Sequence, residues 1–363
     1  MKITDIDKNM LFSSRLDQPD LVWHDPAEEP FAVEGVFPPS EDEPYYHRMP
    51  HAVAKTVNEG VENLAKHTAG GRIRFMTDSP YVAIHVEVPS VGSYQNGSPC
   101  GTLGFDLLID GPTGAQRYVN TFVPPNDKSL VYEVKRDMPY GGLHAATVNM
   151  PLYNKVTRVL IGLQRGSTLL PPPTYDNPLP VLFYGSSITQ GGCASHPCCA
   201  YPAMLARELA FPHINLGFSG SARGEQTMAN YIADIPMRIF VMDYDYNARN
   251  AEHLAQTHEP FYRTVRAKQP TLPVVFISAP TKHSTPSLDA RREVILRTYH
   301  NALERGENVH FVDGSSFFSD ELGEYVTVDN CHPNDLGFYA MARTLKPLLV
   351  RLLDETKGEA AYE

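Results

Sequence analysis

The stretch VLFYGSSITQGG, residues 181–192, indicates how the C-terminal half of the chain folds. Its first four residues are apolar and predict a short buried strand, and Gly185 and two serines then lead into a region that can begin a helix. Ser187 would lie at this strand-to-helix turn, at the carboxyl end of a strand. A serine there is a nucleophile if a base is adjacent, or it simply caps the helix.

After this stretch, β-rich segments alternate with helical ones. Such alternation implies βαβ units, and therefore a parallel sheet with helices on both faces. The expected strands are 181–184, 213–215, 239–242, 274–278 and 309–312, and the expected helices lie near 201–210, 251–268, 289–304 and 334–353. Ligands of such sheets bind beyond the carboxyl ends of the strands, so these ends are the first place to seek a site.

The N-terminal half follows a different pattern, with short strands of period two. In residues 81–88, Val82, Ile84, Val86 and Val88 alternate with small or polar residues, which is typical of a strand with one buried face. Further strands are expected at 105–110, 117–123, 129–134, 145–149 and 157–163. Their number and spacing favour a β-sandwich of the jelly-roll type.

A proline-rich connector is expected to join the two halves. Residues 164–180, QRGSTLLPPPTYDNPLP, contain five prolines, which favour a stiff, extended segment. The expected division is an N-terminal arm over 1–45, a β-sandwich domain over 46–165, a linker over 166–180, an α/β domain over 181–355 and a tail over 356–363. Because residues 1–60 are polar and irregular, the arm is expected to cover another part of the molecule and to form no core element.

Charge and composition limit the classes of partner that this protein can bind. Lys and Arg total 31 and Asp and Glu total 42, and the net charge of −11 disfavours nucleic acid. No apolar run approaches the ~20 residues of a membrane helix, and the first residues, MKITDIDKNM, lack the apolar segment of a signal peptide. We therefore expect a cytoplasmic protein without a cofactor, a nucleic-acid partner or a membrane partner, and a homo-oligomer remains open.

A second informative stretch is VTVDNCHPNDLGF, residues 326–338. Asp329 lies three residues before His332, just ahead of an expected helix. A carboxylate at that offset can hold an imidazole in one tautomer and leave its other nitrogen free to take a proton from a serine. The alternative is a polar loop with a helix-capping residue, and this spacing alone does not decide between them.

Two further segments offer donors for a developing oxyanion. In NLGFSGSARGE, residues 215–225, small residues follow a short strand, and the N–H of Gly220 is the candidate donor. In VMDYDYNAR, residues 241–249, the side-chain amide of Asn247 can reach the same place. The alternative for the glycine segment is an ordinary βα turn.

Together these four segments resemble the SGNH (GDSL-type) hydrolase family. The matching blocks are Gly185-Ser186-Ser187-Ile188, Asn215 to Gly220, Asp245-Tyr246-Asn247 and Asp329 to His332, in the family's order. The resemblance implies a flavodoxin-like α/β domain. It also implies that Ser187, His332 and Asp329 form a catalytic triad, and that the N–H groups of Ser187 and Gly220 form an oxyanion hole with Asn247. Asp245 and Tyr246 are the expected substrate-binding residues.

The sequence departs from the family pattern at several places. Ser186 replaces the usual Asp before the nucleophile, Asp245 replaces a Gly, and Ala248 replaces an Asp. The combination of GSSITQGG with the Asp-Tyr-Asp-x-Asn block is closer to a subgroup that carries an N-terminal β-domain with a Gly-x-Asp-Leu-Tyr motif. Residues 104–108, GFDLL, are similar to that motif, with Leu108 in place of Tyr.

The resemblance implies a serine esterase that forms an acyl-enzyme. The expected substrate is a short-chain acyl ester, with an acetyl ester on carbohydrate as the favoured case. The alternatives are an acyltransferase that uses the same triad and a binding protein whose triad is idle. A long-chain lipase is disfavoured because no apolar lid-like segment is apparent.

The redox state of the cysteines near these motifs is left open. Cys193, Cys198 and Cys199 follow the nucleophile, and Cys331 lies inside the Asp-x-x-His block. A metal site with His196 as a further ligand is one alternative, but the spacing matches no common zinc pattern, so no metal ligand is assigned. A disulfide is a second alternative, and free thiols are the favoured interpretation.

Overall fold

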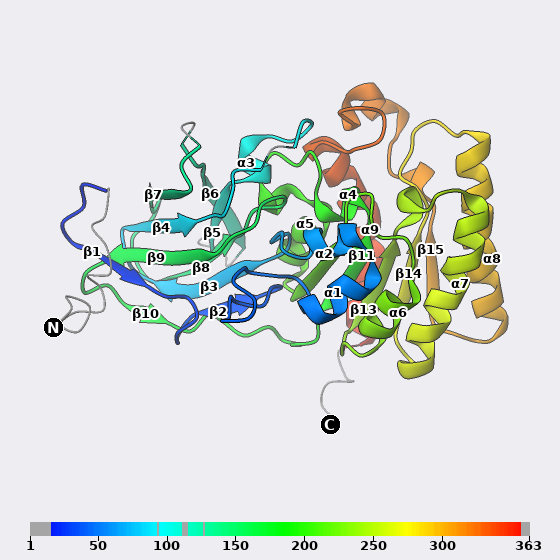
Figure 1. Cartoon of the computed structure of the whole chain (residues 1–363), viewed down its shortest axis with the longest axis horizontal. Coiled ribbons are helices and arrows are strands. Elements are labelled where there is room, and N and C mark those ends of the chain that lie inside the picture. Colours follow the sequence, from blue (N-terminus) through cyan, green and yellow to red (C-terminus); the bar gives the residue numbers. More distant parts are fainter. Residues whose placement is uncertain (1–15, 93, 111–114, 126–127, 357–363) are drawn as a thin grey trace.

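The computed structural model describes residues 16–92, 94–110, 115–125 and 128–356. Antiparallel strands of the N-terminal half gather at one end of the molecule, and a parallel sheet with helices forms the other end (Figure 1). The structure thus confirms the expected fold class, a β-sandwich followed by a doubly wound α/β sheet. None of the described helices is long and apolar enough to cross a membrane.

The sandwich consists of two antiparallel sheets. Its strands are β1 (Leu21–His24), β2 (Ala32–Glu34), β3 (Arg72–Thr77), β4 (Tyr81–Glu87), β5 (Phe105–Asp110), β6 (Gln116–Phe122), β7 (Val131–Asp137), β8 (His144–Asn149), β9 (Arg158–Gln164) and β10 (Leu169–Leu170). One sheet has the order β1-β9-β4-β7, and the other has β10-β3-β8-β5-β6 with β2 beside β3. Val82 and Ile84 of β4 pack in one core with Ile73 and Phe75 of β3, as the period-two pattern predicts.

The β4 strand is buried on both faces, although its pattern predicts only one buried face. Ala83 is fully buried on the second face, where it packs with Leu160 and with Trp23 of β1. Gly162 makes room for the indole, because a Cβ at this position would lie 2.8 Å from the Trp23 ring. The N-terminal residues therefore cover a face that alternation alone assigns to solvent.

The interpretation of the N-terminal stretch as an arm outside the core is wrong for its described part. Strand β1 pairs with β9 and strand β2 pairs with β3, so both belong to the sandwich. Helices α1 (His51–Val57) and α2 (Glu59–Leu64) follow, and Val61 and Leu64 join the core of the α/β domain. Short elements among polar residues give no periodic signal long enough to recognise. Residues 1–15 of the expected arm, and 357–363 of the expected tail, lie outside the described residues.

The α/β domain has a five-stranded parallel sheet in the order β12-β11-β13-β14-β15. The strands are β11 (Val181–Gly185), β12 (His213–Gly217), β13 (Ile239–Asp243), β14 (Val274–Ile277) and β15 (Val309–Val312). The helices are α4 (Ser187–Gln190), α5 (Tyr201–Leu209), α6 (Gln226–Ala233), α7 (Ala251–Lys268), α8 (Pro286–Glu304) and α9 (Asp335–Glu355). Leu182 and Tyr184 pack toward α6, α7 and α8, whereas Val181 and Phe183 pack toward α5 and α9, so both faces of β11 are buried.

Short elements complete the connections. They are helix α3 (Pro99–Thr102) and the 3₁₀ helices η3 (Pro197–Cys199), η4 (Asp245–Asn247), η5 (Gly314–Ser316) and η6 (Asp320–Val326). The expected linker is only partly a connector, because β10 lies within it and pairs with β3. Beyond β10 the connector stays on the sandwich, where the Pro173 carbonyl accepts a hydrogen bond from Arg74 at 2.7 Å and the Tyr175 hydroxyl donates to Glu34 at 3.1 Å.

Two arginines of the N-terminal half join it to the edge strand of the parallel sheet. Arg48 donates to the carbonyls of Asn215 at 3.0 Å and Gly217 at 2.6 Å, and Arg72 donates to the carbonyl of His213 at 3.0 Å. These are alternate residues of β12, so their carbonyls point outward along one edge. The guanidinium groups therefore satisfy the acceptors that a further strand would otherwise bind.

Candidate active site

The first part of the site is the turn between β11 and α4. Ser187 is the first residue of α4, and Ser186 is its N-cap, with a side chain that accepts from the N–H of Ile188 at 3.2 Å. Gly185 before them has no room for a side chain, because a Cβ would lie 2.4 Å from the carbonyl oxygen of Asp243. The capping role that was one alternative for Ser187 thus belongs to Ser186, and the Ser187 hydroxyl is free for another contact.

That contact is with the imidazole of the Asp-x-x-His block. Ser187 Oγ lies 2.8 Å from His332 Nε2, and His332 Nδ1 lies 2.8 Å from Asp329 Oδ2. The other oxygen of Asp329 accepts from the backbone N–H of His332 at 2.8 Å. Burial raises the pKa of Asp329, but the hydrogen bonds from the His332 backbone and side chain outweigh it and keep this pKa below its usual value. The chain of contacts lets the imidazole accept the serine proton and lets the carboxylate stabilise the resulting cation.

A compact loop holds His332 and Asp329 at the start of α9. Thr327 and Pro333 form a β-bridge, and the N–H of Val328 donates to the His332 carbonyl at 2.9 Å. Asn334 then caps α9 by accepting from the N–H groups of Leu336 and Gly337. The loop is therefore fixed at both ends, which orients the imidazole toward the serine.

Gly220 and Asn247, which were predicted to form the oxyanion hole together with Ser187, lie next to each other. Gly220, with φ of +67°, sits in a turn in which the Ser221 N–H donates to the Phe218 carbonyl at 2.9 Å. Asn247 Nδ2 donates to that same carbonyl at 2.8 Å, which uses one of its two amide hydrogens. The Phe218 N–H in turn donates to the Gly185 carbonyl at 2.8 Å, so this turn is tied to the strand that ends before Ser187.

The two predicted substrate-binding residues differ in position. Tyr246 lines a cavity and donates its hydroxyl to the Pro280 carbonyl at 2.8 Å. Asp245 is 2 % exposed, and its carboxylate accepts from the Ala279 N–H at 2.8 Å and lies 3.5 Å from Arg291. The substrate-binding prediction for Asp245 is therefore wrong, because its carboxylate is buried and binds other parts of the protein.

A buried carboxylate beneath the nucleophile turn was not found from the sequence. Asp243 Oδ2 accepts from the hydroxyls of Thr189 and Tyr201, each at 2.9 Å, and its carbonyl accepts from the Ser186 N–H. Burial raises the pKa of Asp243 to about 7, and these two hydrogen bonds limit the rise. The only sequence signal is an acidic residue at the end of a buried strand. Its contacts anchor both ends of α4 to the sheet.

The β-sandwich also contributes residues that the sequence analysis missed. Asn96 Nδ2 donates to Asp329 Oδ2 at 2.8 Å, and the Tyr153 hydroxyl donates to the Ser187 carbonyl at 3.2 Å. Tyr94 stacks on Tyr153 with 4.5 Å between ring centroids and meets the His332 ring edge-on at 6.3 Å. These residues lie in loops distant in sequence from the family blocks, so no local motif marks them. The N-terminal domain thus forms one wall of the site.

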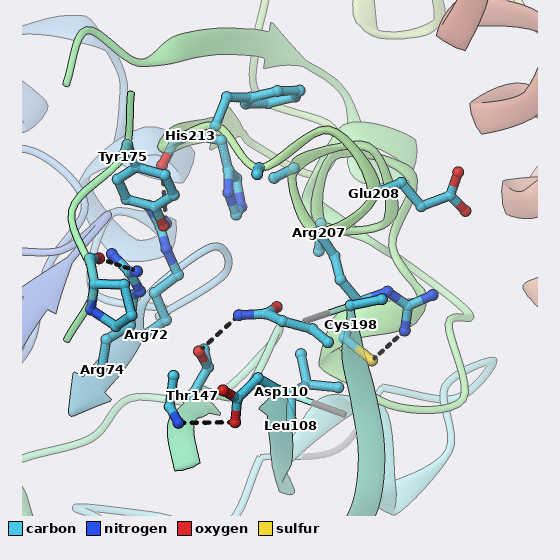
Figure 2. A pocket seen from close by; sticks show the side chains of 18 of the residues that line it. Arg72, Arg74, Leu108, Asp110, Thr147, Tyr175, Cys198, Arg207, Glu208 and His213 are labelled. Carbon is cyan, nitrogen blue, oxygen red and sulfur yellow. Dashed lines mark hydrogen bonds between the residues drawn. The ribbon is translucent and has the colours of Figure 1, made fainter. Parts of the chain in front are cut away.

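Two cavities lie near this region. One, of about 490 Å³, is next to the triad, because its lining includes Asn330 beside Asp329 and Tyr246 beside Asn247. Its wall also carries polar and charged side chains, namely Thr281, Lys282, His283, Thr285, Glu324 and Thr327. The other, of about 590 Å³, lies between the domains, with a wall built from sandwich strands, the Tyr175 connector and α5 (Figure 2). The triad residues themselves line neither cavity.

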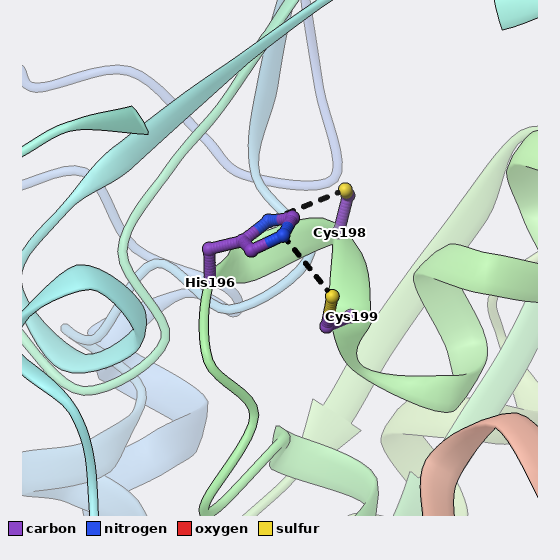
Figure 3. A group of neighbouring side chains, drawn as sticks. All are labelled: His196, Cys198 and Cys199. Carbon is purple, nitrogen blue, oxygen red and sulfur yellow. Dashed lines mark hydrogen bonds between the residues drawn. The ribbon is translucent and has the colours of Figure 1, made fainter. Parts of the chain in front are cut away.

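All five cysteines are free thiols in the structure. Burial, followed by the nearby charge of Asp329, raises the pKa of Cys193 to about 12 and that of Cys331 to about 11, so both thiols are unreactive. Cys198 and Cys199 lie beside His196 on the segment that follows α4 (Figure 3). These two thiols do not contact Ser187.

Comparisons with known proteins agree with this architecture. Residues 179–350 match the GDSL-like lipase/acylhydrolase family, and residues 21–169 match the family described as the N-terminus of SGNH-hydrolase-type esterases. No curated protein matches the sequence significantly. The chain belongs to the GDSL-type (SGNH) hydrolases, in the group with this N-terminal domain, and is a serine esterase or acyltransferase of that family.

Several solved structures share the whole arrangement. A protein described as a GDSL-like lipase, from Bacteroides ovatus, is 26 % identical, with 92 % of this chain and 98 % of that chain covered and a TM-score of 0.81. A salicylyl-acyltransferase from a tetracycline biosynthetic pathway is 21 % identical, with the same coverage and a TM-score of 0.76. An acetyl xylan esterase from the rumen bacterium Butyrivibrio proteoclasticus is 14 % identical, with 92 % and 99 % covered and a TM-score of 0.59. The last two show similarity of fold alone.

Proposed function

We propose that this protein hydrolyses short-chain acyl esters of polar alcohols, and that Ser187 is its nucleophile. The observation that carries the proposal is the unbroken chain of contacts from Ser187 Oγ through His332 to Asp329, with each step at 2.8 Å. It lies at the carboxyl edge of the parallel sheet, where ligands of this fold bind.

The reaction has two steps. His332 Nε2 takes the Ser187 proton as Oγ attacks the ester carbonyl, and Asp329 stabilises the imidazolium. The N–H groups of Ser187 and Gly220 and the remaining amide hydrogen of Asn247 bind the oxyanion. His332 then gives its proton to the leaving alcohol, and a water molecule, activated by the same imidazole, releases the acid.

The cavity beside the triad supports a polar alcohol. It carries hydroxyl, amide, ammonium and carboxylate groups from Thr281, Lys282, Glu324, Thr327 and Asn330. These groups can pair with a molecule that has several hydroxyl groups, such as a sugar, whereas Leu288, Phe318 and Val326 give the same wall an apolar part. An acetylated sugar is therefore the substrate class that we propose.

The test compares p-nitrophenyl acetate, butyrate and octanoate, followed by acetylated sugars, with wild type and Ser187→Ala. We expect the acetate rate to exceed the octanoate rate and to fall by on the order of 10³-fold or more in the variant. Ser186→Ala is the matched control, because it removes the neighbouring hydroxyl and a helix cap but keeps the nucleophile. Equal rates in wild type and Ser187→Ala would contradict the assignment of the nucleophile.

Acyl transfer is the second candidate, because the same cavity can hold an alcohol acceptor in place of water. The measurement is the ratio of transfer product to free acid when alcohols such as glycerol or glucose are added. A transfer product that dominates at millimolar acceptor would identify a transferase, and an unchanged yield of free acid would identify a hydrolase.

A further inference from the structure

A second carboxylate–imidazole pair lies at the junction of the two domains. His196, Cys198 and Cys199 occupy the segment between α4 and α5, and one ligand atom from each lies within 4.8 Å of the others (Figure 3). Cys199 Sγ is 3.2 Å from His196 Nε2, and Cys198 Sγ is 3.5 Å from His196 Nδ1. Two thiols and one imidazole thus converge in a region that the proposed ester chemistry does not use.

The imidazole of this cluster is already oriented. Asp106, in the middle of the sandwich motif GFDLL, is fully buried, and its Oδ2 lies 2.9 Å from His196 Nδ1. The same oxygen accepts from the Cys198 N–H at 2.7 Å, and the other oxygen accepts from Asn149 Nδ2 at 2.6 Å. Because the carboxylate holds a proton on Nδ1, Nε2 is the nitrogen available to a metal ion, and it faces Cys199. Histidines that bind metals are held by a carboxylate in this way.

The surroundings suit charged sulfur ligands. Arg207 Nη1 lies 3.8 Å from Cys198 Sγ, so a positive charge stands beside this sulfur (Figure 2). The ring of Tyr118 stacks on His196 with 4.4 Å between centroids and restrains the imidazole from the sandwich side. The Cys198 side chain is almost completely buried, whereas His196 and Cys199 are partly exposed, which leaves a path for an ion to enter.

We propose that His196 Nε2, Cys198 Sγ and Cys199 Sγ bind one zinc ion, with Asp106 as the outer carboxylate. Thiolate and imidazole ligands are those that zinc prefers, and the fourth position of its tetrahedron falls to water. Binding replaces the two thiol protons and joins the segment that follows α4 to the sandwich through Asp106. The site is separate from the ester chemistry, so its test does not depend on that proposal.

The primary experiment measures the zinc content of the full-length protein after purification with a reductant, addition of Zn²⁺ and gel filtration. We expect about one equivalent per chain in wild type and its loss in Cys199→Ser and in His196→Gln. Cys193→Ser is the matched control, since it makes the same chemical change three residues before His196 and should keep the zinc. Equal zinc in wild type and Cys199→Ser would overturn the proposal.

A second readout does not depend on the folding of any variant. Co²⁺ added to the reduced wild-type protein should give a sulfur-to-cobalt charge-transfer band, and Zn²⁺ should abolish it. Zn²⁺ should also raise the melting temperature of wild type and leave that of Cys199→Ser unchanged. Absence of the cobalt band, or a mass that shows a Cys198–Cys199 disulfide resistant to the reductant, would contradict the zinc site.

Discussion

An aspartate–histidine pair occurs at two places in this molecule. In the proposed triad, Asp329 Oδ2 lies 2.8 Å from His332 Nδ1, and His332 Nε2 faces the Ser187 hydroxyl. At the domain junction, Asp106 Oδ2 lies 2.9 Å from His196 Nδ1, and His196 Nε2 faces the Cys199 thiol. In both places a carboxylate fixes the tautomer and the direction of an imidazole.

The surroundings make the two pairs different. The Asp329 side chain is 32 % exposed and is next to an open cavity, whereas that of Asp106 is 0 % exposed. His332 meets one hydroxyl, whereas His196 meets two thiols. The comparison teaches that the carboxylate–imidazole pair does not define a function by itself. The third group and its access to solvent decide whether the pair moves a proton or holds an ion.

The largest expected effect is on the exposed pair. In Asp329→Asn the amide NH₂ would face His332 Nδ1 or a backbone N–H, which are both donors, so the imidazole would adopt the wrong tautomer. We expect kcat to fall on the order of 10³–10⁴-fold, and the melting temperature to change less than it does in the corresponding variant of Asp106. Steady-state kinetics on p-nitrophenyl acetate measure it, and a loss below tenfold would show that Asp329 does not orient the imidazole.

The matching change at the buried pair should have the opposite profile. In Asp106→Asn one of the three donors loses its acceptor, and we expect the free energy of unfolding to fall by about 2–3 kcal/mol. Urea denaturation measures this loss. Asp106 lies outside the triad, and its replacement should leave the reacting atoms in place. We therefore expect kcat to remain within about threefold of wild type. A kcat loss as large as that of Asp329→Asn would mean that the two pairs act as one unit.

His258 provides a third case for the comparison, because its imidazole has a hydroxyl partner and, among the residues that the structure describes, no carboxylate partner. His258 is buried against Thr298 Oγ1, 2.9 Å from its Nδ1, and burial lowers the pKa of His258 to about 3. The unfolded chain takes up a proton near pH 6.5 and the folded protein does not, so stability is complete above that pH and is lost as the pH falls toward 3. From pH 7.5 to 5 the loss from this residue is about 2 kcal/mol.

The measurement is urea denaturation at pH 7.5 and pH 5. His258→Phe should lose about 2 kcal/mol less than wild type on acidification. Thr298→Val is the control, because it removes the hydrogen-bond partner and keeps the titrating imidazole. The same acid dependence in wild type and His258→Phe would show that this histidine is not held neutral.

The smallest expected effect concerns the sandwich side of the triad. Asn96 donates to Asp329 Oδ2, and its replacement by Ala leaves the carboxylate with its other hydrogen bonds. We expect kcat to fall about three- to tenfold, with little change in KM for p-nitrophenyl acetate. Gln95→Ala, a neighbouring loop change, is the control, and equal kcat in the two variants would remove Asn96 from the positioning of Asp329.

Much of the fold was predictable because long segments carry a clear period. The strands of the parallel sheet and helices α7, α8 and α9 lie close to their expected residues. Strands β1, β2 and β10 were missed because two to four residues are too short for a periodic signal. The first two therefore appeared to be an arm, and the third appeared to belong to a linker.

In the candidate site, too, the residues within a recognisable motif were predicted and the others were not. Ser187, His332 and Asp329 were found because each follows a strand or precedes a helix in a short motif, and the structure brings them together. Tyr94, Asn96 and Tyr153 were missed because their contacts join loops from different domains. The role of Asp245 was misjudged, since its carboxylate contacts Ala279 and Arg291, which are distant in the sequence.

The arginine contacts along β12 have a consequence for modularity. The proline-rich connector invites separation of the chain into two pieces, each matching a family of its own. A C-terminal piece without Arg48 and Arg72 would expose the carbonyls of three alternate residues on an open sheet edge. Such an edge is a template for pairing with another chain. The two arginines of the N-terminal half therefore protect this sheet edge from pairing with another chain. A chimaera in which another domain replaces the sandwich must supply both arginine contacts.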